Sequence, residues 1–135
     1  GFVFQFHELI PELNVMENIC LPGWIKNDSK VVDNANSLIS YFGLDKLKNK
    51  KPNTLSGGEK QRAAIARAMI NNPKIIFADE PTGNLDSKTS AEILQLFHEL
   101  HESGRTIIIV THDDEVAAHC KRCIRMQDGF IKEDY

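Results

Sequence analysis

Two adjacent carboxylates are the strongest candidates for chemistry in the chain. Asp79 and Glu80 follow the apolar run at residues 75–78, which predicts a strand buried on both faces. Because α/β sheets bind ligands at the carboxyl ends of their strands, Asp79 could hold Mg²⁺ there, directly or through water. Glu80 could orient or deprotonate an attacking water. An isolated pair of carboxylates would more often just cap the next turn, but this pair lies 23 positions after Ser56 and runs directly into residues 82–86.

A glycine-rich helix start is the second candidate. The string LSGGEKQR at residues 55–62 opens a helix that we expect to run to about residue 71. Gly57 and Gly58 let backbone N–H groups approach an anion, and the helix dipole adds attraction for negative charge. Ser56 and Glu59 also fit a capping box. The two interpretations are compatible, because capping fixes the turn that a phosphate would use.

His112 and Gln5 also stand at predicted strand ends. His112 follows residues 106–110, which we expect to form a second buried strand, and so shares the rim with Asp79 and Glu80. Gln5 ends the strand-like run that opens the chain. A lone His or Gln is more often structural than catalytic, so neither residue indicates a function by itself.

The elements that must position these residues change in character along the chain. The first half is mostly helical, with an Asn14/Glu17 capping box, a turn-rich segment at residues 22–29 and a helix over 30–42. The second half alternates strands and helices, which predicts an α/β fold with a parallel sheet and a helical insert. Its expected elements are strands at 75–78 and 106–110, helices at 87–103 and from 114, and strands at 124–126 and 130–132 joined at Asp128-Gly129.

Composition excludes several classes of function. The chain has 135 residues, enough for one domain, with 41% hydrophobic and 26% charged residues. Its formal net charge of −3 argues against a basic nucleic-acid footprint. The three cysteines suit a reducing compartment better than a disulfide framework. The Cys120-x-x-Cys123 pair could bind a metal or act as a redox motif, but the lack of a second pair or a nearby His-x-x-His disfavours both.

The motifs together resemble those of the ABC-type ATPases. The string LSGGEKQR is similar to that family's signature motif, and residues 75–81, 82–86 and 110–113 resemble its acidic strand, D-loop and His switch, in family order over the whole chain. The resemblance implies a parallel sheet of the P-loop NTPase type with an inserted helical subdomain. The helical subdomain would cover about residues 6–72 and the α/β core about residues 73–135.

The resemblance also implies a role for each site residue. Asp79 would hold Mg²⁺, Glu80 would handle the attacking water and His112 would contact the γ-phosphate. Gln5 would occupy the Q-loop position and reach Mg²⁺ or the water. Asp86 would belong to the D-loop at a dimer interface. The signature residues would face the ATP held by the opposite subunit, and they are Leu55, Ser56, Gly57, Gly58 and Glu59.

ATP and Mg²⁺ are the cofactors that the resemblance implies. The partners would be a second ATPase subunit, docked head to tail, and integral membrane permease subunits, with no nucleic acid. Phe6 and Trp24 would form part of the surface for the permease, at the cytoplasmic face of a bacterial inner membrane. Residues 4–12, FQFHELIPE, look most like the ATPase of lipoprotein-releasing systems. Macrolide-exporter and cell-division ATPases are alternatives.

A second class of ATPase shares some of these motifs. The carboxyl-terminal lobe of a chromosome-maintenance or DNA-repair ATPase also carries a signature motif and an acidic strand. The compact helical insert between Gln5 and Ser56, with no long heptad coiled coil, disfavours it.

One family element has no counterpart in the chain. No Gly-Lys-Ser or Gly-Lys-Thr occurs, so the P-loop motif G-x-x-x-x-G-K-[ST] is absent. We therefore expect the chain to be the carboxyl-terminal portion of a nucleotide-binding domain, inactive by itself. The resemblance places the P-loop strand beside the strand at 106–110, whose edge we expect to be unpaired and prone to aggregation.

Overall fold

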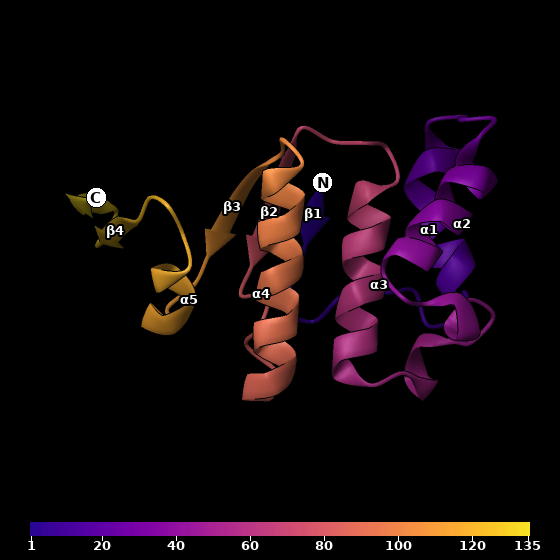
Figure 1. The fold of residues 1–135 in the computed structure, drawn as a ribbon, viewed down its shortest axis with the longest axis horizontal. Coiled ribbons are helices and arrows are strands. Elements are labelled where there is room, and N and C mark those ends of the chain that lie inside the picture. Colours follow the sequence, from indigo (N-terminus) through magenta and orange to yellow (C-terminus); the bar gives the residue numbers. More distant parts are fainter.

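The computed structural model describes all 135 residues and has the α/β architecture that the sequence predicts. A three-stranded parallel sheet lies at its centre, in the order β1-β2-β3. Two helices, α3 and α4, cover one face of this sheet, and α1 and α2 pack on the outer side of α3 (Figure 1). The bounds are β1 (Phe2–Val3), α1 (Val15–Ile25), α2 (Val31–Tyr41), α3 (Gly57–Met69), β2 (Ile75–Asp79), α4 (Ser87–Glu102) and β3 (Thr106–Val110).

The register of the sheet brings the functional strand ends together. Phe77 of β2 lies between Phe2 of β1 and Ile108 of β3, and Asp79 pairs with Val110. The three strands are parallel, so their carboxyl ends meet at one edge. In Figure 1 this edge points downward, as do the first turns of α3 and α4. The strand ends and two helix N-termini therefore lie on the same side of the domain.

The carboxyl-terminal part forms a small separate unit beyond β3. It consists of α5 (Asp114–Ala118) and a two-stranded antiparallel sheet of β4 (Ile124–Gln127) and β5 (Phe130–Asp134). Asp128 and Gly129 join these strands with φ angles of 51° and 79°, the left-handed pair that a two-residue hairpin of type I′ requires. This confirms the predicted turn.

Both predicted capping boxes are present. Asn14 accepts a hydrogen bond from the Glu17 N–H at 2.8 Å, and the Glu17 carboxylate accepts one from the Asn14 N–H at 2.8 Å. Ser56 and Glu59 repeat the arrangement at the start of α3, at 3.2 Å and 2.8 Å. Two otherwise orphaned donors are satisfied at each helix start.

The expected turn-rich segment at residues 22–29 is wrong in its first half. Helix α1 continues through Pro22 to Ile25, although proline removes one helical hydrogen bond. Tertiary packing outweighs that loss: Ile19 is fully buried, and Gly23 lies so close to Val31 that an added Cβ would come within 2.3 Å of its side chain. A lysine-rich segment connects α2 to α3. It contains the 3₁₀ turns η1 (Asp45–Leu47) and η2 (Pro52–Thr54).

The expectation that β2 is buried on both faces is also wrong. Ile76 and Ala78 are 0% and 1% exposed beneath the helices, whereas Ile75 and Phe77 on the other face are 44% and 40% exposed. Both helices that contact the sheet lie on one side, so the strand alternates between buried and exposed positions. The expected burial of the strand at 106–110 is wrong as well, because β3 lies at the sheet edge, pairs with β2 alone and leaves Ile108 and Val110 exposed.

None of the helices combines the length and apolar character required to cross a bilayer.

Candidate functional site

Glu80 and His112 are in direct contact at the carboxyl ends of β2 and β3. Glu80 Oε1 accepts hydrogen bonds from the His112 backbone N–H at 2.9 Å and from the ring Nδ1 at 2.6 Å. The Thr111 hydroxyl donates to the other carboxylate oxygen at 3.0 Å. The structure thus brings together two site residues that lie 32 positions apart in the chain.

The environment changes the acidity of both groups. Burial alone would raise the pKa of Glu80, but the hydrogen bonds from His112 and Thr111 outweigh it and hold that pKa below its usual range. The hydrogen bond to Glu80 and the charge of its carboxylate raise the pKa of His112. Both shifts favour a carboxylate facing an imidazolium.

Glu80 also has an unusual backbone conformation. Its φ of 44° lies in the left-handed region, which costs a non-glycine residue roughly 1–2 kcal/mol. Its N–H still donates to the Val110 carbonyl at 2.8 Å, so the strand pairing extends one residue past β2 before the chain turns. Strained residues cluster at functional sites, and this one carries a carboxylate that the sequence marks as a catalytic candidate.

Asp79 lies beside this pair at the last position of β2. Its side chain is exposed at the sheet edge. Mg²⁺ usually takes only one or two protein carboxylates and leaves its other positions to waters and phosphate oxygens. An exposed carboxylate at this edge fits that kind of coordination.

The signature residues occupy the first turn of α3. Ser56 is the N-cap, and the capping box satisfies the N–H groups of Ser56 and Glu59. Gly57 and Gly58 are the first two helical residues, whose N–H groups have no partner within the helix. Leu55, just before the cap, is buried. The helix end is therefore anchored while two glycine N–H groups stay available to an anion.

Asp86 caps the neighbouring helix. Its carboxylate accepts hydrogen bonds from the Thr89 hydroxyl at 2.6 Å and the Thr89 N–H at 3.2 Å, which lower its pKa. Thr89 in turn packs against Gly58, where an added Cβ would come within 2.5 Å of the Thr89 methyl group. The structure thus places the predicted D-loop and signature residues side by side.

Gln61 is a residue that the sequence analysis missed. It lies on α3, five residues after Ser56, is 1% exposed and donates from Nε2 to the Pro81 carbonyl at 2.7 Å. This bond ties the signature helix to the turn directly after Glu80. The available signal was its spacing, because Gln61 lies four residues before the fully buried Ile65 and so shares its face of α3.

Gln5 lies against the turn that follows the acidic pair. The Asn84 side chain donates to the Gln5 carbonyl at 3.4 Å, and a Cβ on Gly83 would come within 2.8 Å of Gln5 Nε2. The Gly83 N–H in turn donates to the Glu80 carbonyl at 3.1 Å. Gln5 therefore joins the group around Glu80 through the backbone of this turn and makes no direct hydrogen bond to the Glu80 carboxylate.

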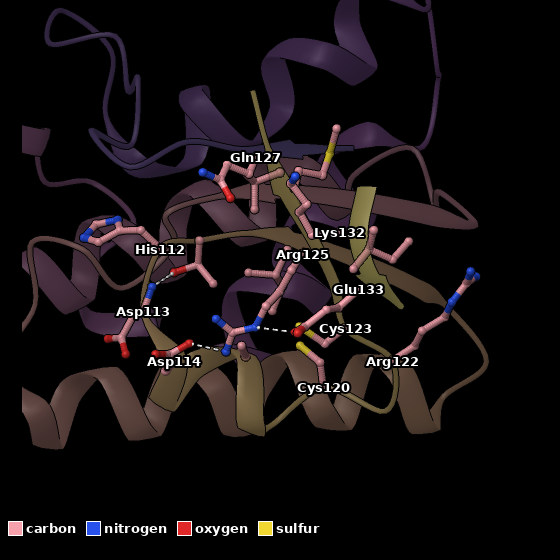
Figure 2. A pocket seen from close by; sticks show the side chains of 16 residues that line it. His112, Asp113, Asp114, Cys120, Arg122, Cys123, Arg125, Gln127, Lys132 and Glu133 are labelled. Carbon is pink, nitrogen blue, oxygen red and sulfur yellow. Dashed lines mark hydrogen bonds and ion pairs between the residues drawn. The ribbon is translucent and has the colours of Figure 1, made fainter. Parts of the chain in front are cut away.

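A cavity of about 700 Å³ lies between the His112 segment and the β4–β5 hairpin. Figure 2 shows the Arg125 guanidinium in its lining between Asp114 and Glu133, at 2.7 Å and 3.6 Å. Cys120 and Cys123 line the same cavity as free thiols. Burial raises the pKa of Cys120, and the neighbouring Cys123 raises it further, which disfavours a reactive thiolate.

The chain shares extensive similarity with known proteins. A family profile described as ABC transporter matches residues 1–83. The lipoprotein-releasing system ATP-binding protein LolD of Syntrophotalea carbinolica is 51% identical over 134 residues, which cover 97% of this chain and 59% of that protein. The macrolide export ATP-binding/permease protein MacB of Bdellovibrio bacteriovorus is 48% identical, over 99% of this chain and 21% of that protein.

A solved structure has the same fold. The dimeric ATP-binding cassette MJ0796, in a post-hydrolysis state bound to ADP and Pi, superposes with a TM-score of 0.84 at 44% identity, over 100% of this chain and 61% of that one. The chain thus spans about three fifths of this cassette and of the LolD relative. Since the family profile matches well over half of its residues, the chain belongs to the ABC transporter family.

Proposed function

We propose that the protein containing this chain binds and hydrolyses ATP as the nucleotide-binding part of an ABC transporter. The contact between Glu80 and His112 at the carboxyl ends of β2 and β3 carries the proposal. It supplies a carboxylate fixed by three hydrogen bonds, next to the exposed Asp79. Family membership and the ADP and Pi bound to the solved relative support it.

The residues present fit ATP and Mg²⁺. Bound ATP would supply the γ-phosphoryl group that is transferred to water, and Mg²⁺ would neutralise charge on the phosphates. Asp79 would hold the metal, Glu80 would orient the water and accept its proton, and His112 would hydrogen-bond to phosphate oxygens. Gln5 would help to place the water or the metal from the turn beside Gly83. We also propose that about residues 6–72 form the helical subdomain of this ATPase and about residues 73–135 its α/β core.

The signature residues would act on the nucleotide of a second subunit. The free N–H groups of Gly57 and Gly58 and the Ser56 hydroxyl suit a phosphate. In a head-to-tail dimer they would close over the ATP held by the opposite copy, with Asp86 at the interface. The dimeric state of the solved relative supports this arrangement.

Lipoprotein release is the first candidate for the transport process. The identity to a LolD protein is 51%, against 48% to a MacB protein, so macrolide export is the second candidate. In either case the partners would be integral membrane permease subunits. The location would be the cytoplasmic face of a bacterial inner membrane. The exposed Phe6 and Trp24 would contribute to the permease contact.

The test is Glu80→Gln in a complete cassette that carries residues 1–135 after a P-loop segment. We expect turnover to fall at least a hundredfold while ATP binding stays within threefold, because glutamine keeps the shape but cannot accept a proton. Glu102→Gln, at an exposed glutamate of α4, is the matched control and should leave both quantities unchanged. Hydrolysis by Glu80→Gln within threefold of the parent protein would refute the role of Glu80.

A further inference from the structure

The segment that follows Gln5 turns through two consecutive left-handed residues. His7 has a φ of 65° and Glu8 a φ of 49°. Side chains disfavour this region, and outside glycine it is visited singly rather than in succession. Within the segment, the His7 N–H donates to the Phe4 carbonyl at 3.1 Å and the Glu8 N–H to the Phe6 carbonyl at 2.8 Å. Those two bonds leave the carbonyls of His7 and Glu8 free to accept others.

Arg67 of α3 donates a hydrogen bond to each of these two carbonyls. Its Nη2 donates to the His7 carbonyl at 2.7 Å, and its Nη1 donates to the Glu8 carbonyl. The planar guanidinium presents several donors in a fixed fork, which suits two adjacent carbonyls turned to the same side. Burial lowers the pKa of Arg67, and the Glu8 charge opposes that shift. The guanidinium is thus held against the turn at some cost in hydration.

This contact connects two parts of the proposed site. The His7–Glu8 turn begins two residues after Gln5, whose side chain and carbonyl face Gly83 and Asn84. Arg67 lies in the last turn of α3, the helix whose first turn carries the signature residues. The position of Gln5 relative to this helix therefore depends on how the turn between them is held.

We propose that Arg67 is a positioning residue that clasps the His7–Glu8 turn in its left-handed conformation and so fixes Gln5 for catalysis. The inference rests on the proposed ATPase function. If Arg67 serves only to fill space, its apolar replacement changes stability alone. If it holds the turn, glycine at positions 7 and 8 compensates for its loss, because glycine adopts positive φ without steric cost.

The experiment uses the complete cassette and follows both conformation and turnover. In Arg67→Met we expect the backbone chemical shifts of His7 and Glu8 to lose their left-handed signature and the Gln5 side-chain amide signal to move. We expect kcat to fall at least tenfold while KM for Mg·ATP changes less than twofold. Arg67→Lys, which can reach one carbonyl, should give an intermediate kcat. Introducing His7→Gly and Glu8→Gly into Arg67→Met should restore kcat to within threefold of the glycine pair alone.

Arg122→Met is the matched control, because Arg122 also makes a two-bond fork, to Asp134 at 2.9 Å and 2.6 Å in the distant hairpin. It should leave kcat unchanged. Unaltered shifts of His7, Glu8 and Gln5 in Arg67→Met would overturn the proposal, as would relaxed shifts with an unchanged kcat or a failure of the glycine pair to rescue. A parent cassette without ATPase activity would refute the proposed function separately. The shift measurements on Gln5 would still decide the role of Arg67.

Discussion

The Glu80 carboxylate and the His112 imidazole form a hydrogen-bonded ion pair in which each partner stabilises the charged form of the other. Nδ1 donates to Oε1 at 2.6 Å, and the backbone N–H of the same histidine donates to the same oxygen at 2.9 Å. The pair joins the ends of two neighbouring strands. The ion pair is therefore lost in acid, when Glu80 is protonated, and in base, when His112 loses its proton.

The Glu80–His112 pair should give the protein a specific dependence of stability on pH. The raised pKa of His112 contributes stability that is complete below the ordinary value of 6.5 and is lost as the pH rises through the raised folded value. The lowered pKa of Glu80 contributes stability above its ordinary value of 4.5, which is lost as the pH falls through the lowered folded value. We expect the ring-proton NMR signal of His112 to titrate with a midpoint above 6.5. In Glu80→Gln the midpoint should fall back toward 6.5, because the carboxylate that raises the pKa of His112 is gone. A midpoint below 6.5 in the parent protein would show that the pair does not form in solution.

A bulky substitution in the signature turn should prevent dimerisation. In a complete cassette, Ser56→Arg should block ATP-driven dimerisation with less than threefold loss of ATP binding to the monomer, because a bulky cation would fill the space where the opposite nucleotide docks. The substitution also removes the N-cap, which costs about 1 kcal/mol. Ser56→Ala is the comparison, because it removes both the cap and the hydroxyl without adding bulk. It should still dimerise, since the N–H groups of Gly57 and Gly58 remain available to the opposite nucleotide. An ATP-dependent dimer of Ser56→Arg in light scattering would contradict the head-to-tail arrangement.

Replacing Asn18, which lies far from the site, should strongly reduce the stability of the fold. It is fully buried in α1; its side-chain oxygen accepts from the Ile10 N–H at 2.7 Å, and its amide donates to the carbonyls of Ile10, Leu13 and Asn14 at 3.0–3.1 Å. Asn18→Ala removes all of these bonds and leaves the Ile10 N–H and the Leu13 carbonyl without a partner, whereas the Ile10 and Asn14 carbonyls keep their backbone bonds from the Leu13 and Asn18 N–H groups. We expect a loss of roughly 3 kcal/mol in the free energy of unfolding. Asn36→Ala, exposed on α2 with one bond to the Val32 carbonyl, should cost less than about 0.5 kcal/mol. Equal losses in urea denaturation of the two variants would contradict this account.

These residues show which features the sequence could predict. The capping boxes of Asn14 and Ser56 depend on neighbours three residues away, and both were predicted. The rim shared by Glu80 and His112 follows from the parallel order of the strands. Gln61 and Arg67 were missed because their partners, Pro81 and the His7–Glu8 turn, lie 20 to 60 positions away and are backbone carbonyls without a sequence signal. The continuation of α1 through Pro22 and the exposure of Phe77 likewise depend on what packs against them.

The last prediction concerns residues 1–135 as a separate polypeptide, which should bind no Mg·ATP at millimolar nucleotide and show no ATPase activity. Most phosphate contacts in a P-loop enzyme come from the backbone and lysine of that loop, and the chain contains no Gly-Lys-Ser or Gly-Lys-Thr. The groups that remain at the sheet edge include the carboxylates of Asp79 and Glu80, which repel polyphosphate in the absence of a metal. Mg²⁺ held by one or two carboxylates needs nucleotide oxygens to complete its shell. Gly57 and Gly58 cannot compensate, because in the proposed dimer they serve a nucleotide anchored on the opposite subunit.

Isothermal titration calorimetry is the measurement, with the complete cassette as the positive control. A saturable signal with millimolar or tighter affinity that disappears in Asp79→Ala would establish residues 1–135 as a nucleotide site in their own right and contradict this prediction.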